Sequence, residues 1–208
     1  MPLKVFIVNG NKLYDNMFEN EGFTLVDCVE HADVVCFTGG EDVSPALYGE
    51  LRHPHTHTNM GRDMQEVGIY QECIHSNTPM VGICRGGQFL NVMSGGGLYQ
   101  HVDGHANGLD HEIVTQKGDI VEVTSTHHQM MKMGEAGVLL AYAHNVSTIR
   151  NNFVNGVFVG EQGEHQDVEV VYYPNTNALC FQPHPEFNGV PDCTNYFFNT
   201  LESVIGKP

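Results

Sequence analysis

Short apolar runs alternate with helical patterns along the first half of the chain. Residues 4–8, 32–37 and 80–83 are rich in Val, Ile and Phe, which is typical of strands buried on both faces of a sheet. Apolar residues recur at helical spacing from Asp63 until Asn77-Thr78-Pro79, and again from residue 86 to residue 94. This alternation predicts an α/β fold with a mainly parallel sheet covered by helices on both faces.

The second half of the chain resembles a set of antiparallel strands followed by a helix. Five runs have strand character: residues 119–124, 138–143, 153–160, 168–173 and 178–182. The segment Pro174-Asn175-Thr176-Asn177 predicts a hairpin turn between the last two. Residues 195–205 are expected to form a closing helix, and residues 51–62 a loop. Without a repeat or linker, residues 1–208 are expected to form a single three-layer, doubly wound domain.

The excess of acidic residues makes some classes of binding partner improbable. Nine Lys and Arg stand against 25 Asp and Glu, for a formal net charge of −16, and such a field repels the phosphates of nucleic acids. No apolar run is long enough to span a bilayer, and the first residues lack a signal-peptide pattern. Six Cys residues without a CxxC pair are typical of a reducing compartment. We therefore expect a cytoplasmic protein that binds neither nucleic acid nor membrane.

The candidate chemistry is concentrated around Cys84. A predicted strand, the segment Gly82-Ile83-Cys84-Arg85-Gly86 and a predicted helix follow one another, as in a nucleophile elbow with Cys as the nucleophile. Small residues are needed on both sides because the turn is tight. The amino end of the helix favours the reactive thiolate, and the N–H of Arg85 would point at the oxygen that becomes negative. The alternative is a buried Cys in a Gly-rich turn.

A base and its orienting group follow the last predicted strand. His184 can take a thiol proton and return it to a leaving amine, and Glu186 can hold the imidazole in the required tautomer. Pro183 and Pro185 stiffen the backbone around His184. Taken alone, this segment would be read as a loop histidine beside a solvated Glu. Together with Cys84, it predicts a Cys–His–Glu triad.

Five segments, in a fixed order along the chain, resemble the class I glutamine amidotransferases. Two of them, 82–88 and 184–186, carry the resemblance to the superfamily, and the other three are similar to its γ-glutamyl hydrolase branch, which includes γ-glutamyl-γ-aminobutyrate hydrolases and is classed as peptidase C26. The matching segments are residues 39–50, 82–88, 91–100, 125–129 and 184–186, and Arg62-Asp63 also fits that branch. Thr38, Thr124 and Pro183 depart from the family's pattern, at positions outside the triad.

The resemblance implies a flavodoxin-like, class I glutamine amidotransferase-like fold and a role for each matching position. Cys84, His184 and Glu186 would form the catalytic triad. The oxyanion-hole N–H groups would come from Gly39, Gly40 and Arg85. The α-amino and α-carboxylate ends of a γ-glutamyl group would be held by Gln88, Ser125, Thr126 and His127.

Three alternating histidines, His53, His55 and His57, suggest a metal site, because they would share one face of an extended strand. No Cys or carboxylate stands at ligand spacing beside them in the sequence, so we favour a compositional interpretation and predict no metal.

The other clustered histidines are interpreted without a ligand. His101, His105 and His111 lie in a segment rich in Gly, Asp and Asn, and we expect them to be exposed. His127 and His128 belong to one of the matching segments, and one of the two is a candidate for a structural role.

The residues and the resemblance together predict cysteine-dependent hydrolysis of a γ-glutamyl amide, either glutamine or a γ-glutamyl amine conjugate, through a γ-glutamyl thioester. No organic cofactor is expected. One alternative is a glutaminase component that passes ammonia to a separate synthetase, and another is a non-catalytic binding protein on the same fold. The intact Cys84, His184 and Glu186 argue against a binding protein, and the branch-like segments favour a stand-alone hydrolase. A homo-oligomer is compatible with each of the three.

Overall fold

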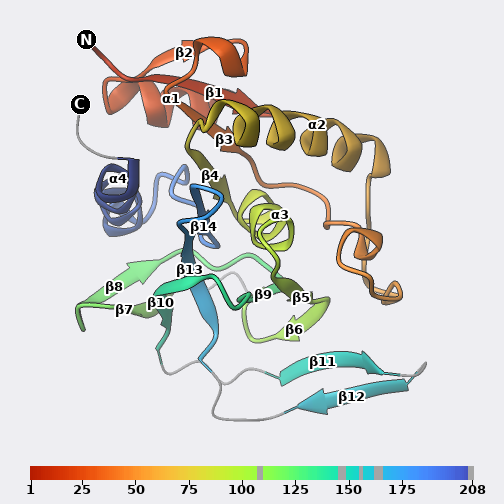
Figure 1. Ribbon diagram of the computed structural model, residues 1–208. Helices are drawn as coiled ribbons and strands as arrows, with labels where there is room; N and C mark the ends of the chain where they lie inside the picture. Colours follow the sequence, from red (N-terminus) through yellow and green to blue (C-terminus); the bar gives the residue numbers. More distant parts are fainter. Residues whose placement is uncertain (107–109, 145–148, 155–156, 162–165, 206–208) are drawn as a thin grey trace.

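One large sheet forms the centre of the fold (Figure 1). The computed structural model describes residues 1–106, 110–144, 149–154, 157–161 and 166–205. Strands follow the order β2-β1-β3-β4-β14-β13-β10-β7-β8, with β9 paired to β13 and β5 to β9. The parallel half comprises β1 (Lys4–Val8), β2 (Thr24–Val26), β3 (Val34–Phe37), β4 (Met80–Ile83) and β14 (Ala178–Phe181). The antiparallel half comprises β5 (Gly97–Tyr99), β7 (His111–Thr115), β8 (Ile120–Val123), β9 (Met130–Lys132), β10 (Val138–Ala143) and β13 (Val168–Tyr173).

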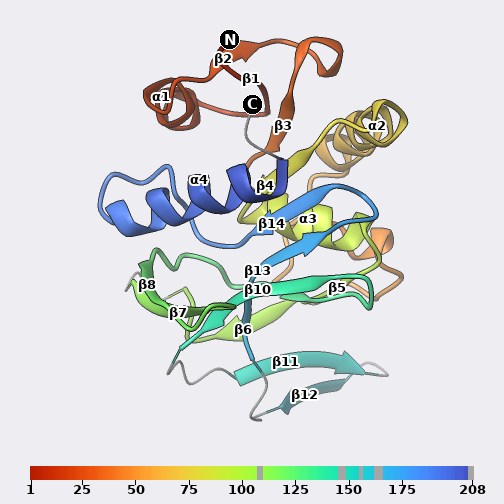
Figure 2. The same cartoon turned by 60° about the vertical axis from the view of Figure 1, so that its left-hand side comes forward.

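Helices cover both faces of the parallel half, as the second view also shows (Figure 2). On one face lie α1 (Lys12–Asn20) and α4 (Pro191–Ile205), and on the other α2 (Met60–Ser76) and α3 (Arg85–Met93). Short 3-10 helices occupy Val29–His31 and Pro45–Leu47. Within the described ranges, no helix is long and apolar enough to cross a bilayer.

The continuous apolar runs of the sequence follow from burial on both faces of the sheet. In β3, Val34 and Cys36 pack with the α1 and α4 side chains, whereas Val35 and Phe37 pack with those of α2 and α3. All four residues of the strand are fully buried. Alternate residues of a strand point to opposite faces, so a strand covered on both sides can carry no polar position. This three-layer arrangement confirms the predicted fold class.

Several predicted strands match the structure to the residue, and the differences elsewhere have local causes. Helix α2 begins at Met60, earlier than predicted, because the Asn59 side chain accepts a hydrogen bond from Arg62 N at 3.2 Å and caps the helix. Helix α4 begins at Pro191 rather than at residue 195, and Pro suits the first turn because it lacks an N–H.

The prediction of one strand over residues 153–160 is wrong. That stretch contains parts of two antiparallel strands, β11 (Ile149–Val154) and β12 (Val157–Glu161), which form a second, small sheet with β6 (His101–Asp103). Between them the sequence reads Asn155-Gly156, a strong short-range signal for a hairpin. Because apolar residues stand on both sides of this pair, the whole stretch resembled one continuous strand.

The close approach of α3 to the sheet depends on glycine. A Cβ built on Gly82 would overlap the backbone of Gly86, and one built on Gly86 would overlap the carbonyl of Phe37 in β3. A Cβ on Gly87 would lie 2.9 Å from the backbone of Phe181 in β14. Helix α3 can therefore lie this close to β3, β4 and β14 only while these positions carry no side chain.

We expect Gly86→Ala to lower the free energy of unfolding by about 1–3 kcal/mol, because the added methyl group must displace backbone atoms. Gly68→Ala in α2 is the matched control, since nothing lies within 4 Å of its Cβ position. Ala should raise stability there by about 0.5–1 kcal/mol through helix propensity. Urea unfolding followed by circular dichroism measures both. Equal effects at the two positions would contradict the packing constraint at Gly86.

Candidate active site

Cys84 occupies a strained turn between β4 and α3. Its backbone has φ 52° and ψ −112°, a conformation that residues with a Cβ rarely adopt. The Cys84 N–H donates to the Phe181 carbonyl at 2.8 Å, and the Cys84 carbonyl accepts from Gln88 N at 2.9 Å. These bonds join the turn to β14 and to the first turn of α3. The thiol thus lies at the carboxyl end of a central strand, where the sequence places it.

His184 and Glu186 follow β14, the strand next to β4. The His184 Nδ1–H donates to Glu186 Oε1 at 2.7 Å, which fixes the orientation of the imidazole. The backbone N–H of His184 donates to Thr124 Oγ1 at 2.7 Å, and its ring stacks on Phe187 at 4.6 Å between centroids. The backbone of His184 is therefore held by Thr124, and its ring by Glu186 and Phe187.

The surroundings of His184 favour its protonated form. Burial would lower the pKa of the ring, but Cys84 and Glu186 outweigh burial and raise this pKa to about 10. At neutral pH the imidazole therefore carries a proton. The pKa is raised above its ordinary value of about 6.5, so the stability contributed by the charged ring is complete below about pH 6.5. It is lost as the pH rises through about 10.

Gly39 lies beside His184 and Cys84, but its N–H already has a partner. A Cβ built on Gly39 would lie 3.0 Å from His184 Cε1 and 3.8 Å from Cys84 Cβ. The Gly39 N–H donates to the hydroxyl of Tyr14 at 3.1 Å. Tyr14 comes from α1, a helix that the sequence reasoning missed although Asn11 and the apolar spacing that follows it are a helix-start signal. Of the two predicted glycine donors, Gly40 is therefore the better candidate beside Arg85.

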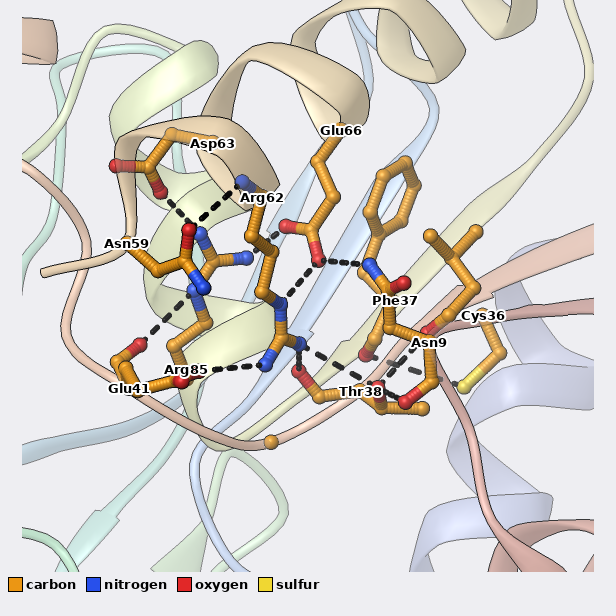
Figure 3. A network of polar contacts seen from close by, with 12 residues as sticks. Asn9, Cys36, Phe37, Thr38, Glu41, Asn59, Arg62, Asp63, Glu66 and Arg85 are labelled. Carbon is orange, nitrogen blue, oxygen red and sulfur yellow. Dashed lines mark hydrogen bonds and ion pairs between the residues drawn. The ribbon is translucent and has the colours of Figure 1, made fainter.

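A buried network of four charged side chains lies beneath the turn (Figure 3). The Arg85 guanidinium pairs with the carboxylates of Asp63 and Glu66, both from α2. Arg62 Nε donates to Glu66 Oε1 at 2.7 Å. Arg85, Asp63 and Glu66 are at most 2% exposed, and burial lowers the pKa of Arg85 to about 10. Sequence reasoning used only the backbone of Arg85 and missed this network.

The same network holds the loop that carries the glycines. Arg62 Nη2 donates to the Thr38 carbonyl at 2.9 Å, and Arg85 Nε donates to the Glu41 carbonyl at 3.1 Å. The Arg62 guanidinium lies against Gly40, where a Cβ would overlap it, and Gly40 has φ 145°. The loop and the first residue of α3 are therefore tied to the same side chains of α2.

A pocket of about 190 Å³ opens beside the thiol. It is lined by Gly40, Glu41, Asp42, His57, Cys84, Arg85, Gln88, Thr126, His127, His128 and Gln129. Gln88 Nε2 donates to the Gln129 carbonyl and to Gln182 Oε1, each at 3.1 Å. Both of its N–H groups are thus used within the protein, which leaves Gln88 Oε1 to accept a hydrogen bond from a ligand.

Ser125 lies in the pocket wall rather than on the pocket surface. It is 2% exposed, and its hydroxyl donates to the His105 carbonyl at 2.6 Å. Of the predicted substrate-binding residues, Gln88, Thr126 and His127 therefore line the pocket, and Ser125 supports it from behind.

The alternating histidines do not converge on one point. His53 and His55 pack against each other and against His101, with ring centroids 4.9–5.5 Å apart. His57 lines the pocket, and its backbone N–H donates to Asp42 Oδ2 at 2.8 Å. Among the residues that the structure describes, this stretch supplies no set of three converging metal-binding atoms.

The expectation that His101, His105 and His111 are exposed is wrong, since His101 is only partly exposed and the other two are more deeply buried. His105 is fully buried, and the side chain of His111 is only 11% exposed. Both rings face Glu169 of β13, a residue that the sequence reasoning did not single out. Gly and Asp around His105 suggested an exposed loop, whereas its carbonyl and ring are enclosed by partners from other segments.

Comparisons with known proteins point to one family. The family model described as Peptidase C26 matches residues 18–186. A Mycobacterium tuberculosis protein provisionally named a glutamine amidotransferase is 34% identical over 77% of this chain and 53% of its own length. The carbamoyl phosphate synthase small chain of Helicobacter pylori is 29% identical over 68% of this chain and 33% of its own length. The solved structure of a glutamine amidotransferase from Thermotoga maritima matches with a TM-score of 0.60 at 13% identity, over 98% and 85% of the two chains. The chain spans 30–66% of the length of four curated relatives that it matches.

We expect Glu66→Gln to lower the free energy of unfolding by about 3–5 kcal/mol, because it leaves buried guanidinium charge uncompensated. The matched control is Glu72→Gln on the exposed face of the same helix, with an expected change within about 0.5 kcal/mol. Thermal or urea unfolding measures the difference. Similar stability in both variants would mean that the network around Arg85 is not a structural constraint.

Glu186→Gln should lower the pKa of His184, because the carboxylate is one of the groups that raise it. NMR titration of the ring, assigned by comparison with His184→Asn, measures the midpoint in the wild type and in the variant. The control is Glu30→Gln in the exposed 3-10 helix, which should leave the midpoint unchanged. An unchanged midpoint in Glu186→Gln would contradict the assigned pairing.

Proposed function

The chain belongs to the peptidase C26 family, and from this premise we propose that it hydrolyses a γ-glutamyl amide through a thioester on Cys84. The observation that carries the proposal is the strained turn of Cys84 beside the oriented pair of His184 and Glu186, at the edge of a small pocket. A nucleophile, a proton carrier and its orienting group are the parts that amide cleavage needs.

In the proposed reaction, Cys84 Sγ attacks the carbonyl carbon of the γ-amide and forms a tetrahedral intermediate. The former carbonyl oxygen carries a negative charge in this intermediate, and the backbone N–H groups of Gly40 and Arg85 are suited to stabilise that charge. The C–N bond then breaks as His184 gives its proton to the departing nitrogen, leaving a γ-glutamyl thioester. Water attacks the thioester, His184 takes a proton from that water, and glutamate leaves with the thiol restored. Each of these steps uses groups of this chain alone.

The pocket is compatible with a small, zwitterionic acyl group as part of the substrate. Gln88 Oε1 can accept from an α-amino group, and Glu41 and Asp42 add negative charge to the same pocket. The backbone of residues 125–127 is the proposed contact for the α-carboxylate. A volume of about 190 Å³ suits a γ-glutamyl group, with the leaving group directed outwards past His57.

A second candidate is the release of ammonia from glutamine for use by a separate synthetase. The observation in its favour is the match to the carbamoyl phosphate synthase small chain over 68% of this chain. The same Cys84 chemistry would serve both functions, and they differ only in the leaving group and the partner. A non-catalytic binding role is the weakest of the three because it leaves the strained turn of Cys84 and its interaction with the His184–Glu186 pair without a use.

The proposal predicts that a glutamine-mimicking diazo ketone labels Cys84. Intact-mass spectrometry should find a single adduct on the wild type and none on Cys84→Ala. The control is Cys28→Ser, because Cys28 is the most exposed of the six thiols and would take up any nonspecific label. This variant should be labelled like the wild type. Equal labelling of Cys84→Ala would exclude Cys84 as the nucleophile.

Turnover on glutamine and on γ-glutamyl amines distinguishes the two candidates. Release of glutamate from a γ-glutamyl amine by the chain alone supports the hydrolase. Added hydroxylamine should attack the γ-glutamyl thioester in place of water and give γ-glutamyl hydroxamate with the thiol released. Labelling of Cys84 without turnover on any γ-glutamyl amine would instead favour the ammonia-donating function.

A further inference from the structure

A second cluster of reactive side chains lies behind the pocket wall. His105 follows β6, His111 begins β7, His127 lies between β8 and β9, and Glu169 lies in β13. These strands gather in the lower half of Figure 2. The side chains of His105 and Glu169 are fully buried, and those of His127 and His111 are 2% and 11% exposed. Four segments of the chain thus bring three imidazoles around one carboxylate.

The distances within this cluster match those between the ligands of a tetrahedral metal ion. Glu169 Oε1 lies 3.6 Å from His105 Nδ1, 3.3 Å from His111 Nε2 and 3.6 Å from His127 Nε2. The donor atoms of His105, His127 and Glu169 all lie within 4.8 Å of one another. Tetrahedral zinc with bonds of about 2.0–2.1 Å separates neighbouring ligand atoms by about 3.3–3.4 Å. These three donors therefore need little adjustment to hold an ion, and His111 Nε2, which lies near Glu169 Oε1 but outside that group of three, would move toward the ion to complete its coordination.

Hydrogen bonds on the outer side of two rings orient their inner nitrogens for ligation. His127 Nδ1–H donates to the Gln129 carbonyl at 2.9 Å. His105 Nε2–H donates to Asp167 Oδ2 at 3.1 Å. In each neutral ring the nitrogen that faces Glu169 is then the one with a lone pair. A carbonyl or carboxylate behind the imidazole is the usual support of a metal-bound histidine.

The interior of the cluster lacks a positive charge to match these lone pairs. Within the described part of the chain, both carboxylate oxygens of Glu169 and His127 Nε2 are buried without a hydrogen bond of good geometry, and the ring nitrogens nearest to Glu169 Oε1 lie 3.3–3.6 Å away. One protonated ring would neutralise Glu169 but would leave lone pairs of the other rings unmatched, and His105 and His127 cannot both be protonated without repulsion because they lie 4.6 Å apart between centroids. A divalent cation neutralises the carboxylate and accepts all the lone pairs at once.

We propose that His105, His111, His127 and Glu169 form a structural zinc site. Three imidazoles and one carboxylate suit a borderline ion such as Zn²⁺, and four protein ligands complete its tetrahedral coordination. The buried position leaves no room for a reacting group, so the ion holds segments together and takes no part in catalysis.

The site would stabilise the wall of the pocket. His127 lines the pocket on one side and ligates the ion on the other. Ser125 donates to the His105 carbonyl, and the Gln129 carbonyl accepts from both His127 and Gln88. One ion thus links the loop after β6, the wall segment 125–129 and β13. The proposal does not depend on the proposed reaction.

Metal content of the full chain tests the site directly. After loading with Zn²⁺ and dialysis, the wild-type protein is expected to retain about one zinc ion per chain, as measured by elemental mass spectrometry. Glu169→Gln and His111→Asn should retain less than a tenth of that. The control is Cys28→Ser, which removes the exposed group of Asp27, Cys28 and His31, another place where three ligand atoms converge. This variant should keep its zinc.

Two further measurements keep the test decisive if a ligand variant fails to fold. Co²⁺ added to the wild type should give the visible absorption of a tetrahedral ion without a thiolate charge-transfer band. Asp167→Asn keeps all four ligands and should weaken zinc binding by about 10–100-fold in a competition with a chromogenic chelator.

Three results would overturn the proposal. They are a zinc-free wild type after loading, zinc that is lost in Cys28→Ser, and a Co²⁺ spectrum dominated by thiolate. A zinc-free wild type would mean that protons, and no metal ion, fill the cluster.

Discussion

The close packing of α3 against three strands is the constraint on which the rest of the structure depends. Gly82, Gly86 and Gly87 leave no side chain at the points of closest approach, so the helix axis can approach the backbones of β3, β4 and β14. The chain must then turn within a single residue, and Cys84 takes the strained conformation that this turn requires. Strain at the thiol and dense packing beneath it thus have the same origin.

Arg85 connects this turn to the second helix of the same layer. Its backbone N–H lies in the first turn of α3, and its side chain enters the buried network with Asp63 and Glu66. A Lys could not replace it, because only the planar guanidinium can pair with two carboxylates and donate from Nε to the Glu41 carbonyl at the same time. One residue therefore positions a candidate oxyanion donor and anchors the loop that carries the other. Buried charges without these partners would be costly, so the network also makes the packing of α2 specific.

The walls of the pocket are built differently on its two sides. On the side of Cys84, Thr124 and Phe187 hold the backbone and ring of His184, and Cys84 and Glu186 keep the pKa of His184 high. Thr124, a departure from the family's pattern, therefore has a clear structural use. On the opposite side, the wall segment rests on the buried histidines and Glu169. Elements of both halves of the sheet meet at the pocket.

Local patterns in the sequence determined the strands, because each strand is a short run of mainly apolar residues that pack against other elements. Residues 4–8, 80–83, 138–143 and 168–173 were predicted to the residue from such runs, although only 80–83 is buried at every position and β13 also carries the buried Glu169. The turn at Cys84 was equally visible, since its glycines are demanded by backbone contacts within one short segment and its neighbours. Only the tertiary structure decided which distant polar groups meet. Glu66 and Arg85 pair across two helices, Tyr14 reaches Gly39 from the other face of the sheet, and Glu169 gathers histidines from three segments. The spacing of residues along the chain does not predict these contacts. A buried charged side chain needs a partner close in space, and the residues next to it in sequence do not indicate which distant residue that partner is.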